Sequence, residues 1–232
     1  MQKKSIVITL DGPSGSGKST VASALARELG YRYLDTGAMY RAVTLAVLNS
    51  GLSVDPVDEH GISQLLHRTR IELDDSGRIV IDGQRLDDEA LRVDSVTKAV
   101  SNVSALNNVR ERLVALQREF ARGGDIVAEG RDLGSVVFPT AFARYYLDAD
   151  PEVRARRRAQ QESRCRQDNK PVDERVVLQA IRERDQKDRR RELAPLILAP
   201  GVELIDTNAL TWQEVVASLV NRVQKRLNCG LR

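Results

Sequence analysis

Residues 12–19 form a glycine-rich segment, G-P-S-G-S-G-K-S, that matches the pattern G-x-x-x-x-G-K-[ST] at every defined position. The apolar stretch 5–11 before it predicts a buried strand, and residues 19–29 after it predict a helix that ends at Gly30. Glycines let the backbone turn tightly, so that consecutive N–H groups point at one centre beside the positive end of the helix. The arrangement of strand, loop and helix therefore predicts a site for the phosphates of a nucleoside triphosphate.

Two side chains of this loop supply chemistry that the backbone lacks. Lys18 is a mobile cation for the β and γ phosphates, and Ser19 offers a hydroxyl ligand to Mg²⁺. The loop alone leaves kinases, GTPases, motors and binding modules open. Residues 169–172, Asn-Lys-Pro-Val, lack the acid of a guanine-recognition motif, which argues against a guanine-specific switch. The small size of the chain favours a small-molecule kinase over a motor.

Further apolar segments alternate with helical patterns along the chain. The predicted strands are 5–11, 33–35, 125–129, 143–147 and 202–206. The predicted helices include 19–29, 38–49, 107–122 and a last one that opens at a Thr211–Glu214 capping box. This alternation predicts an α/β protein with a five-stranded parallel sheet flanked by helices, the P-loop NTPase fold.

One stretch interrupts the alternation. Two short apolar runs, 71–75 and 78–81, are joined at Ser76-Gly77, which is the signal of a β-hairpin. We therefore predict a small inserted lobe over residues 55–91 that contains this hairpin. The predicted core is made of residues 1–54 and 92–232.

Length and composition narrow the class further. A chain of 232 residues with 41% apolar and 30% charged side chains can form one well-packed core. No apolar run reaches the length of a membrane span, and the stretch before Asp11 is too short for a signal peptide. We expect a cytoplasmic protein that is a monomer and has no membrane partner. Cys165 and Cys229 stand alone and predict neither a disulfide nor a zinc site.

Basic residues concentrate in one region of the chain. Between Pro151 and Arg191 there are 14 Lys and Arg against 8 Asp and Glu, although the net charge is only +3. Most of the basic residues are Arg, which pairs bidentately with phosphate, although a GC-rich genome would also favour it. A nucleic-acid-binding protein is the rival of a different class. The 4% aromatic content provides few base-stacking platforms, so we expect no nucleic-acid partner.

Two further segments combine glycine with charged side chains directly after a predicted strand. They are residues 35–41, D-T-G-A-M-Y-R, and residues 129–134, E-G-R-D-L-G. Open α/β sheets bind ligands at the carboxyl ends of their strands, so Arg41 and Arg131 should point into the same crevice as the phosphate loop. Two cations there suit an acceptor that is already a phosphate monoester. The alternative, that each arginine only pairs with a nearby carboxylate, stays open.

A third charged segment has helical spacing. Arg184, Asp188 and Arg191 lie at i, i+4 and i+7 and therefore share one helix face. Such a face is either a solvated, salt-bridged surface or, in this basic region, part of the acceptor site.

Four segments together identify a family. G-P-S-G-S-G-K-S, L-D-T-G-A-M-Y-R, E-G-R-D-L-G-S-V-V-F-P and R-D-x-x-D-R-x-R-x-x-A-P-L follow one another over nearly the whole chain. The sequence resembles the bacterial-type cytidylate kinases, P-loop enzymes that convert CMP or dCMP to the diphosphate. The resemblance implies ATP and Mg²⁺ as cofactors and CMP and dCMP as substrates; a P-loop kinase for UMP, a deoxynucleoside or a shikimate-like acceptor is the alternative. Thr36 and Glu129 stand where some relatives have Ser and Asp.

The resemblance also implies roles for individual residues. ATP would lie on Gly12, Pro13, Ser14, Gly15, Ser16, Gly17, Lys18, Ser19 and Thr20, with Ser19 also serving the metal. The acceptor phosphate would lie on Arg41 and Arg131, cytosine on Thr36, Arg110, Asp132 and Arg191, and the ribose on Ser101, Arg184 and Asp188. A short lid over about 151–170 would bring Arg154, Arg156, Arg157 and Arg158 to the transferring phosphate. The implied catalytic side chains are Lys18, Arg131, Arg154 and Arg158, and the segment 55–91 resembles the family's extra lobe on the acceptor side.

The chemistry of the base agrees with this placement of Asp132 and Arg110. Cytosine presents an amino donor beside two acceptors, whereas uracil presents an acceptor where cytosine has its donor. An aspartate accepts and an arginine donates, so the pair matches cytosine. Uracil would leave an acceptor against the carboxylate, at a cost of roughly 1–3 kcal/mol.

Overall fold

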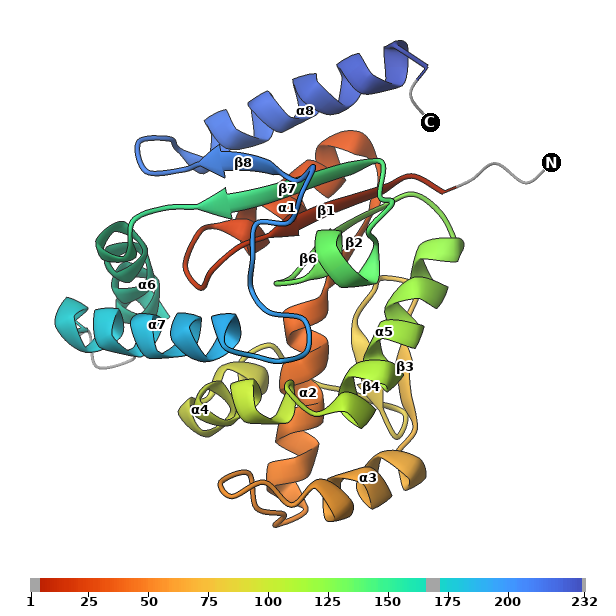
Figure 1. Ribbon diagram of the computed structural model, residues 1–232, viewed down its shortest axis with the longest axis vertical. Coiled ribbons are helices and arrows are strands. Elements are labelled where there is room, and N and C mark those ends of the chain that lie inside the picture. The colour runs from red at the N-terminus through yellow and green to blue at the C-terminus, as the bar shows by residue number, and fades with distance from the viewer. Residues whose placement is uncertain (1–4, 166–171, 231–232) are drawn as a thin grey trace.

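The computed structural model describes residues 5–165 and 172–230 and has a five-stranded parallel sheet at its centre (Figure 1). The strand order is β2-β6-β1-β7-β8, and every neighbouring pair is parallel. The strands are β1 (Val7–Asp11), β2 (Arg32–Asp35), β6 (Ile126–Glu129), β7 (Ala143–Asp148) and β8 (Glu203–Asp206). The predicted α/β class and five-stranded parallel sheet are confirmed.

Helices cover both faces of this sheet. α1 (Lys18–Leu29) and α8 (Trp212–Asn228) pack on one face, while α2 (Thr36–Asn49) and α5 (Asn107–Arg122) pack on the other. The strands are apolar on both sides because both sides are buried, and Val127 belongs to one core cluster while its neighbour Ala128 belongs to the other. The capping box between Thr211 and Glu214 opens α8 as predicted.

The segment 55–91 contains more structure than the predicted hairpin. The hairpin forms from β3 (Ile71–Leu73) and β4 (Ile79–Ile81), and a third strand, β5 (Gln84–Arg85), extends it in the order β3-β4-β5. Helix α3 (Glu59–Arg68) precedes it, and the short 3₁₀-helix η1 (Ala90–Arg92) follows it. Ile71, Ile79 and Ile81 join the same hydrophobic cluster as α2 and α5, so the segment packs directly onto that side of the molecule.

The remaining helices frame one end of the sheet. α4 (Asp94–Val103) lies beside α2, and α6 (Pro151–Cys165) packs against α7 (Glu174–Arg189) through a small apolar cluster. The π-helical turn η2 (Leu133–Val137) follows β6. The predicted lid over about 151–170 includes α6, but its residues 166–170 lie outside the described residues. So do the side chain of Cys165 and residues 169–171 of the segment 169–172 that was compared with a guanine-recognition motif. Within the described ranges no helix is both long and apolar enough to cross a bilayer.

Candidate active site

A cavity of about 870 Å³ opens at the carboxyl ends of β1, β2 and β6. The segments that directly follow these strands line it, namely 14–20, 35–37 with 40–41, and 129–132. This position follows from the fold, because all parallel strands end at the same edge of the sheet. The cavity therefore brings together three of the segments in which the sequence places functional side chains.

The phosphate loop joins β1 to α1 with the predicted geometry. Gly17, in the left-handed region with φ of 89°, is the N-cap of α1 and carries no side-chain cap, so backbone N–H groups at the helix start are available to a ligand. Gly12 has a φ of 142°, and a Cβ there would overlap the carbonyl oxygen of Leu147. A side chain at either glycine would distort the loop.

Lys18 lies buried within this loop. Its Nζ donates to the carbonyl oxygen of Pro13 at 2.6 Å and to Oγ of Ser16 at 3.3 Å. Burial, together with the nearby guanidinium of Arg131, holds the pKa of Lys18 well below its usual range. An anion bound in the loop would favour the charged ammonium and offset this effect.

Ser19 and Glu129 form the oxygen-rich part of the cavity wall. Ser19 Oγ donates to Oε2 of Glu129 at 2.9 Å, and the Tyr33 hydroxyl donates to Oε1 at 2.6 Å. Burial and the neighbouring Asp35 raise the pKa of Glu129. No group of three or more His, Cys, Asp or Glu side chains among the described residues could hold a metal by itself. A hydroxyl and a carboxylate facing a phosphate loop fit Mg²⁺, which takes oxygen ligands and keeps waters or substrate phosphates as the others.

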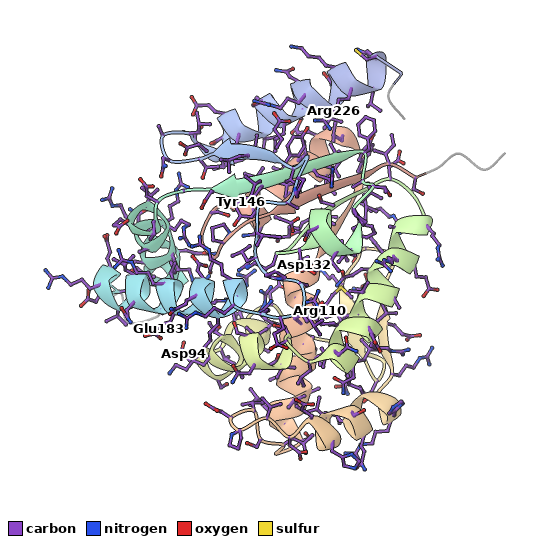
Figure 2. All side chains as sticks on the ribbon, in the orientation of Figure 1. Asp94, Arg110, Asp132, Tyr146, Glu183 and Arg226 are labelled. Carbon is purple, nitrogen blue, oxygen red and sulfur yellow. The ribbon has the colours of Figure 1, made fainter. Side chains whose placement is uncertain are left out.

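Arg110 of α5 and Asp132 form a buried ion pair in the wall of the cavity, and each side chain is only 7% exposed. Figure 2 shows the two labelled side chains close together between the sheet and the helices below it. The Arg110 guanidinium also lies 5.8 Å from the centre of the Tyr40 ring. Burial raises the pKa of Asp132, and the Arg110 guanidinium opposes that rise. The structure thus presents a fixed acceptor beside a fixed donor.

Three arginines, Arg131, Arg184 and Arg191, lie around Asp188, and a fourth, Arg41, lies near Arg184. Arg131 Nε and an Nη of Arg191 donate to its carboxylate at 3.2 and 2.6 Å, and Ser101 donates to it from α4 at 3.2 Å. Burial raises the pKa of Asp188, but the surrounding guanidinium groups outweigh burial and hold it below its usual value. The other two members of the group, Arg41 and Arg184, line the same cavity.

This group has more positive than negative charge. Among the described residues, its ion pairs are those of Arg131 and Arg191 with Asp188 and of Arg41 with Asp35 at 3.1 Å. Arg184 has no such pair, and its buried Nε has no hydrogen-bond partner within the described part of the chain. Burial and the nearby Arg131 lower the pKa of Arg184 to about 10. An anion in the cavity would compensate this unbalanced charge.

Comparison with known proteins agrees with the four segments noted in the sequence. A family model described as cytidylate kinase matches residues 8–225. The chain belongs to the cytidylate kinase family. Relatives described as cytidylate kinases include those of Mycobacterium leprae, 45% identical over 95% of this chain and 96% of the relative, and Pelotomaculum thermopropionicum, 46% identical over 93% and 95%. The Solibacter usitatus relative is 41% identical over 99% of this chain and 97% of its own.

The arginines of α6 are not equivalent in this family member. Arg158 lines the cavity and donates to Glu162 at 2.6 Å, and Arg157 lines it while donating to the carbonyl oxygen of Thr207 at 2.6 Å. Arg156 is exposed and lies 4.0 Å from Glu174. The structure brings only Arg157 and Arg158 of the four predicted lid arginines to the cavity wall.

Arg154 requires a correction to the predicted lid position. Its guanidinium is buried beneath the phosphate loop, where it donates to the Ser14 carbonyl oxygen at 2.8 Å and to Asp185 at 2.6 Å. The other carboxylate oxygen of Asp185 accepts from the Ser14 backbone N–H at 3.3 Å. Arg154 does not line the cavity, and its contacts are those of a residue that supports the loop.

Two residues with a part in the site were missed at the sequence level. Asp11, the last residue of β1, accepts hydrogen bonds from the backbone N–H groups of Leu133 and Gly134 at 2.9 and 2.7 Å, and burial raises its pKa to about 7. Tyr33 holds Glu129 from β2. An acidic residue directly before the phosphate loop was the available signal for Asp11. The pairing of Tyr33 with Glu129 depends on strand order, so no local signal predicts it.

Proposed function

We propose that this protein transfers the γ-phosphoryl group of ATP to CMP or dCMP and releases ADP with CDP or dCDP. The observation that carries the proposal is the shared cavity, in which a phosphate loop faces a group of arginines with unbalanced positive charge. Two anionic phosphate groups must approach one another for such a transfer, and these two parts of the wall suit one anion each. Membership of the cytidylate kinase family supports the same reaction.

The phosphate of the acceptor would lie on Arg41 and Arg131, with Arg184 close by. Guanidinium groups suit this task because their planar fork pairs with two phosphate oxygens at once. Arg41 and Arg131 already bind Asp35 and Asp188, so their positions are held before a ligand arrives. Such pre-organisation reduces the entropy that substrate binding must overcome.

Cytosine would be recognised by Asp132 and Arg110. The carboxylate would accept from the exocyclic amino group, and the guanidinium would donate to the ring acceptors. Thr36 and Arg191 would complete the base site, and Ser101, Arg184 and Asp188 would hold the ribose. Uracil would present an acceptor to a buried carboxylate, so we expect a preference of roughly 1–3 kcal/mol for cytosine.

ATP would be the donor, with its phosphates on the residues 12–20. Lys18 would move from the carbonyl oxygen of Pro13 to the β and γ phosphates. Mg²⁺ would be held by Ser19, with Glu129 ordering its shell, and when bound it would neutralise charge on the phosphates. The nucleoside of ATP would extend toward the part of the cavity lined by Arg157, Leu210 and Trp212.

The transfer itself would depend on position and charge. A phosphate monoester has a second pKa near 6 and is largely ionised at neutral pH, so no general base is required. Arg131 would hold the acceptor in line, while Lys18 and Arg158 would stabilise the charge that spreads over the moving group. Closer approach of α6 and α7 over the cavity would exclude water, the competing acceptor.

A coupled assay of ADP release across CMP, dCMP, UMP, AMP and shikimate tests this function. We expect the highest kcat/KM with CMP or dCMP, in a reaction that requires Mg²⁺. A preference for UMP, AMP or shikimate would assign the site to another small acceptor. Absence of turnover, together with RNA or DNA binding that depends steeply on salt, would contradict the kinase function altogether.

A further inference from the structure

The hairpin of the segment 55–91 touches the central sheet through its turn. Gly77 sits between β3 and β4 with a φ of 79°, yet it is buried, because the turn lies against β2. A Cβ on Gly77 would approach the carbonyl oxygen of Tyr33 more closely than real Cβ atoms do and would lie 3.0 Å from Cζ of Phe120. The absence of a side chain therefore permits this contact.

The turn is itself held firmly. The carboxylate of Asp74 accepts from the backbone N–H groups of Ser76 and Arg78 at 2.9 and 3.0 Å and from the Ser76 hydroxyl at 2.6 Å. It also pairs with Arg85 of β5 at 2.7 Å, which ties the turn to the third strand. A turn with this many internal bonds is a stiff surface for β2 to pack against.

The contact falls on a strand that serves the cavity. β2 is an edge strand, and the turn covers it at Tyr33. The Tyr33 hydroxyl donates to Glu129, which in turn accepts from Ser19. Asp35, two residues after Tyr33 in β2, caps α2 by accepting from the N–H of Ala38 at 2.8 Å, and it also binds Arg41. A displacement of β2 would therefore reach both the metal side and the acceptor side of the cavity.

We propose that the segment 55–91 positions the catalytic site through this turn, with Gly77 fixing β2 and Tyr33 fixing Glu129 and Ser19. This inference rests on the proposed kinase function, and it assigns a role to the insertion in that reaction. Gly77 and Tyr33 are positioning residues, because neither would contact the reacting atoms.

The chain offers a matched control for the test. Gly83, in the turn between β4 and β5, has a φ of 80°, and nothing lies within 4 Å of a Cβ built on it. Gly77→Ala and Gly83→Ala thus impose the same backbone strain, and only Gly77→Ala presses on Tyr33. We expect Gly77→Ala to lower kcat for transfer from ATP to CMP by about tenfold to a hundredfold, because a small displacement of the groups in a phosphoryl-transfer site has an effect of this size. The kcat of Gly83→Ala should stay within about twofold of the wild-type value.

Tyr33→Phe removes the hydroxyl alone and should lower kcat by about tenfold, because Glu129 loses one of its two side-chain hydrogen bonds. The kcat of the double variant Gly77→Ala/Tyr33→Phe should be no lower than that of the less active single variant, because both changes act through the position of Glu129. Additive losses would contradict a shared route through Tyr33.

A second readout does not depend on turnover. Mg²⁺ with ADP should raise the Tm of wild type and of Gly83→Ala by the same increment, and both Gly77→Ala and Tyr33→Phe should lose part of it. The inference would be overturned if the two glycine variants had equal kcat values and the same rise in Tm with Mg²⁺ and ADP. If Gly77→Ala fails to fold, the inference would be overturned by a Tyr33→Phe variant that has the kcat of wild type and the same rise in Tm with Mg²⁺ and ADP. Wild-type protein that transfers nothing to CMP refutes the proposed function instead, and the Tm comparison still decides the role of the turn.

Discussion

The carboxylate of Asp11 accepts a hydrogen bond at 2.7 Å from the backbone N–H of Gly134, which lies 123 residues further along the chain. A second bond, from Leu133, ends on the other oxygen of the same carboxylate. Asp11 directly precedes the phosphate loop, and Leu133 directly follows Asp132. One buried side chain therefore connects the donor loop to the segment that would recognise the acceptor base.

The buried position of Asp11 predicts an unusual dependence of stability on pH. Its folded-state pKa of about 7 lies above the ordinary value of 3.8, so the folded state binds its proton more tightly than the unfolded state does. The resulting stabilisation is fully present below pH 3.8 and is lost as the pH rises through 7. Relative to Asp11→Asn, wild type should lose up to about 1.4 kcal/mol of unfolding free energy per pH unit between pH 4 and 7. Urea denaturation across this range measures the difference, and parallel curves for the two proteins would contradict the assignment.

Lys18→Ala should reduce transfer from ATP by more than about a hundredfold, because no other described side chain places a mobile ammonium in the phosphate loop. The KM for CMP should change little, since Lys18 belongs to the donor side. Steady-state kinetics with each substrate varied in turn separates the two effects. Wild-type turnover in this variant would refute the assigned role.

Arg131→Ala should weaken the reaction with monophosphates and raise the KM for CMP by about tenfold or more, through loss of a charge-assisted contact worth roughly 1.5–3 kcal/mol. Arg112→Ala, which changes an exposed arginine on α5, controls for a general loss of positive charge. Equal CMP kinetics in the two variants would count against an acceptor role for Arg131.

Asp132→Asn should erode the preference for CMP over UMP by about tenfold to a hundredfold, because an amide can donate to uracil where a carboxylate cannot. The measurement is the ratio of kcat/KM values for the two nucleotides. This ratio isolates recognition from any loss of stability that follows when the buried Arg110 loses its charged partner. An unchanged ratio would show that the base is read elsewhere.

Substitution of Arg154 should mainly affect the free energy of unfolding, whereas substitution of Arg158 should mainly affect kcat. Arg154→Ala breaks a buried ion pair with Asp185 and should lower the free energy of unfolding by about 3–5 kcal/mol. Arg158→Ala removes a partly exposed side chain at the cavity wall and should lower kcat with little change in stability. Chemical denaturation and kinetics on both variants provide the comparison, and the reverse pattern would restore Arg154 to the predicted lid.

Features that depend only on residues close together in the sequence were predictable. The phosphate loop combines fixed glycine spacing with a strand before it and a helix after it, and each of these signals is read from adjacent residues. Arg184 and Asp188 share a face of α7, as helical spacing predicts, whereas Arg191 lies just beyond the end of this helix; all three line the cavity. Arg41 and Arg131 could be assigned to one crevice because parallel strands end at one edge.

Features set by packing between distant segments were not predictable. Asp11 and Tyr33 acquire their partners only through the strand order β2-β6-β1. Helix α3 was missed although Ile62, Leu65 and Leu66 have helical spacing, because the helix is short and contains Gly61. β5 has only two residues, too few for a periodic signal. The expected lid position of Arg154 was wrong for the same kind of reason, because its burial depends on Asp185, 31 residues away.

The most direct test of transfer between two phosphate groups is ³¹P NMR of wild-type protein mixed with ATP, Mg²⁺ and CMP. We predict that the γ-phosphate signal of ATP declines towards equilibrium while the paired phosphoanhydride signals of the two diphosphates, ADP and CDP, grow, with little inorganic phosphate. Cytidine in place of CMP should give no phosphorylated product, because it offers the arginine group no phosphate. Formation of inorganic phosphate alone, or of a phosphomonoester from cytidine, would contradict the claim that the cavity joins two phosphate groups.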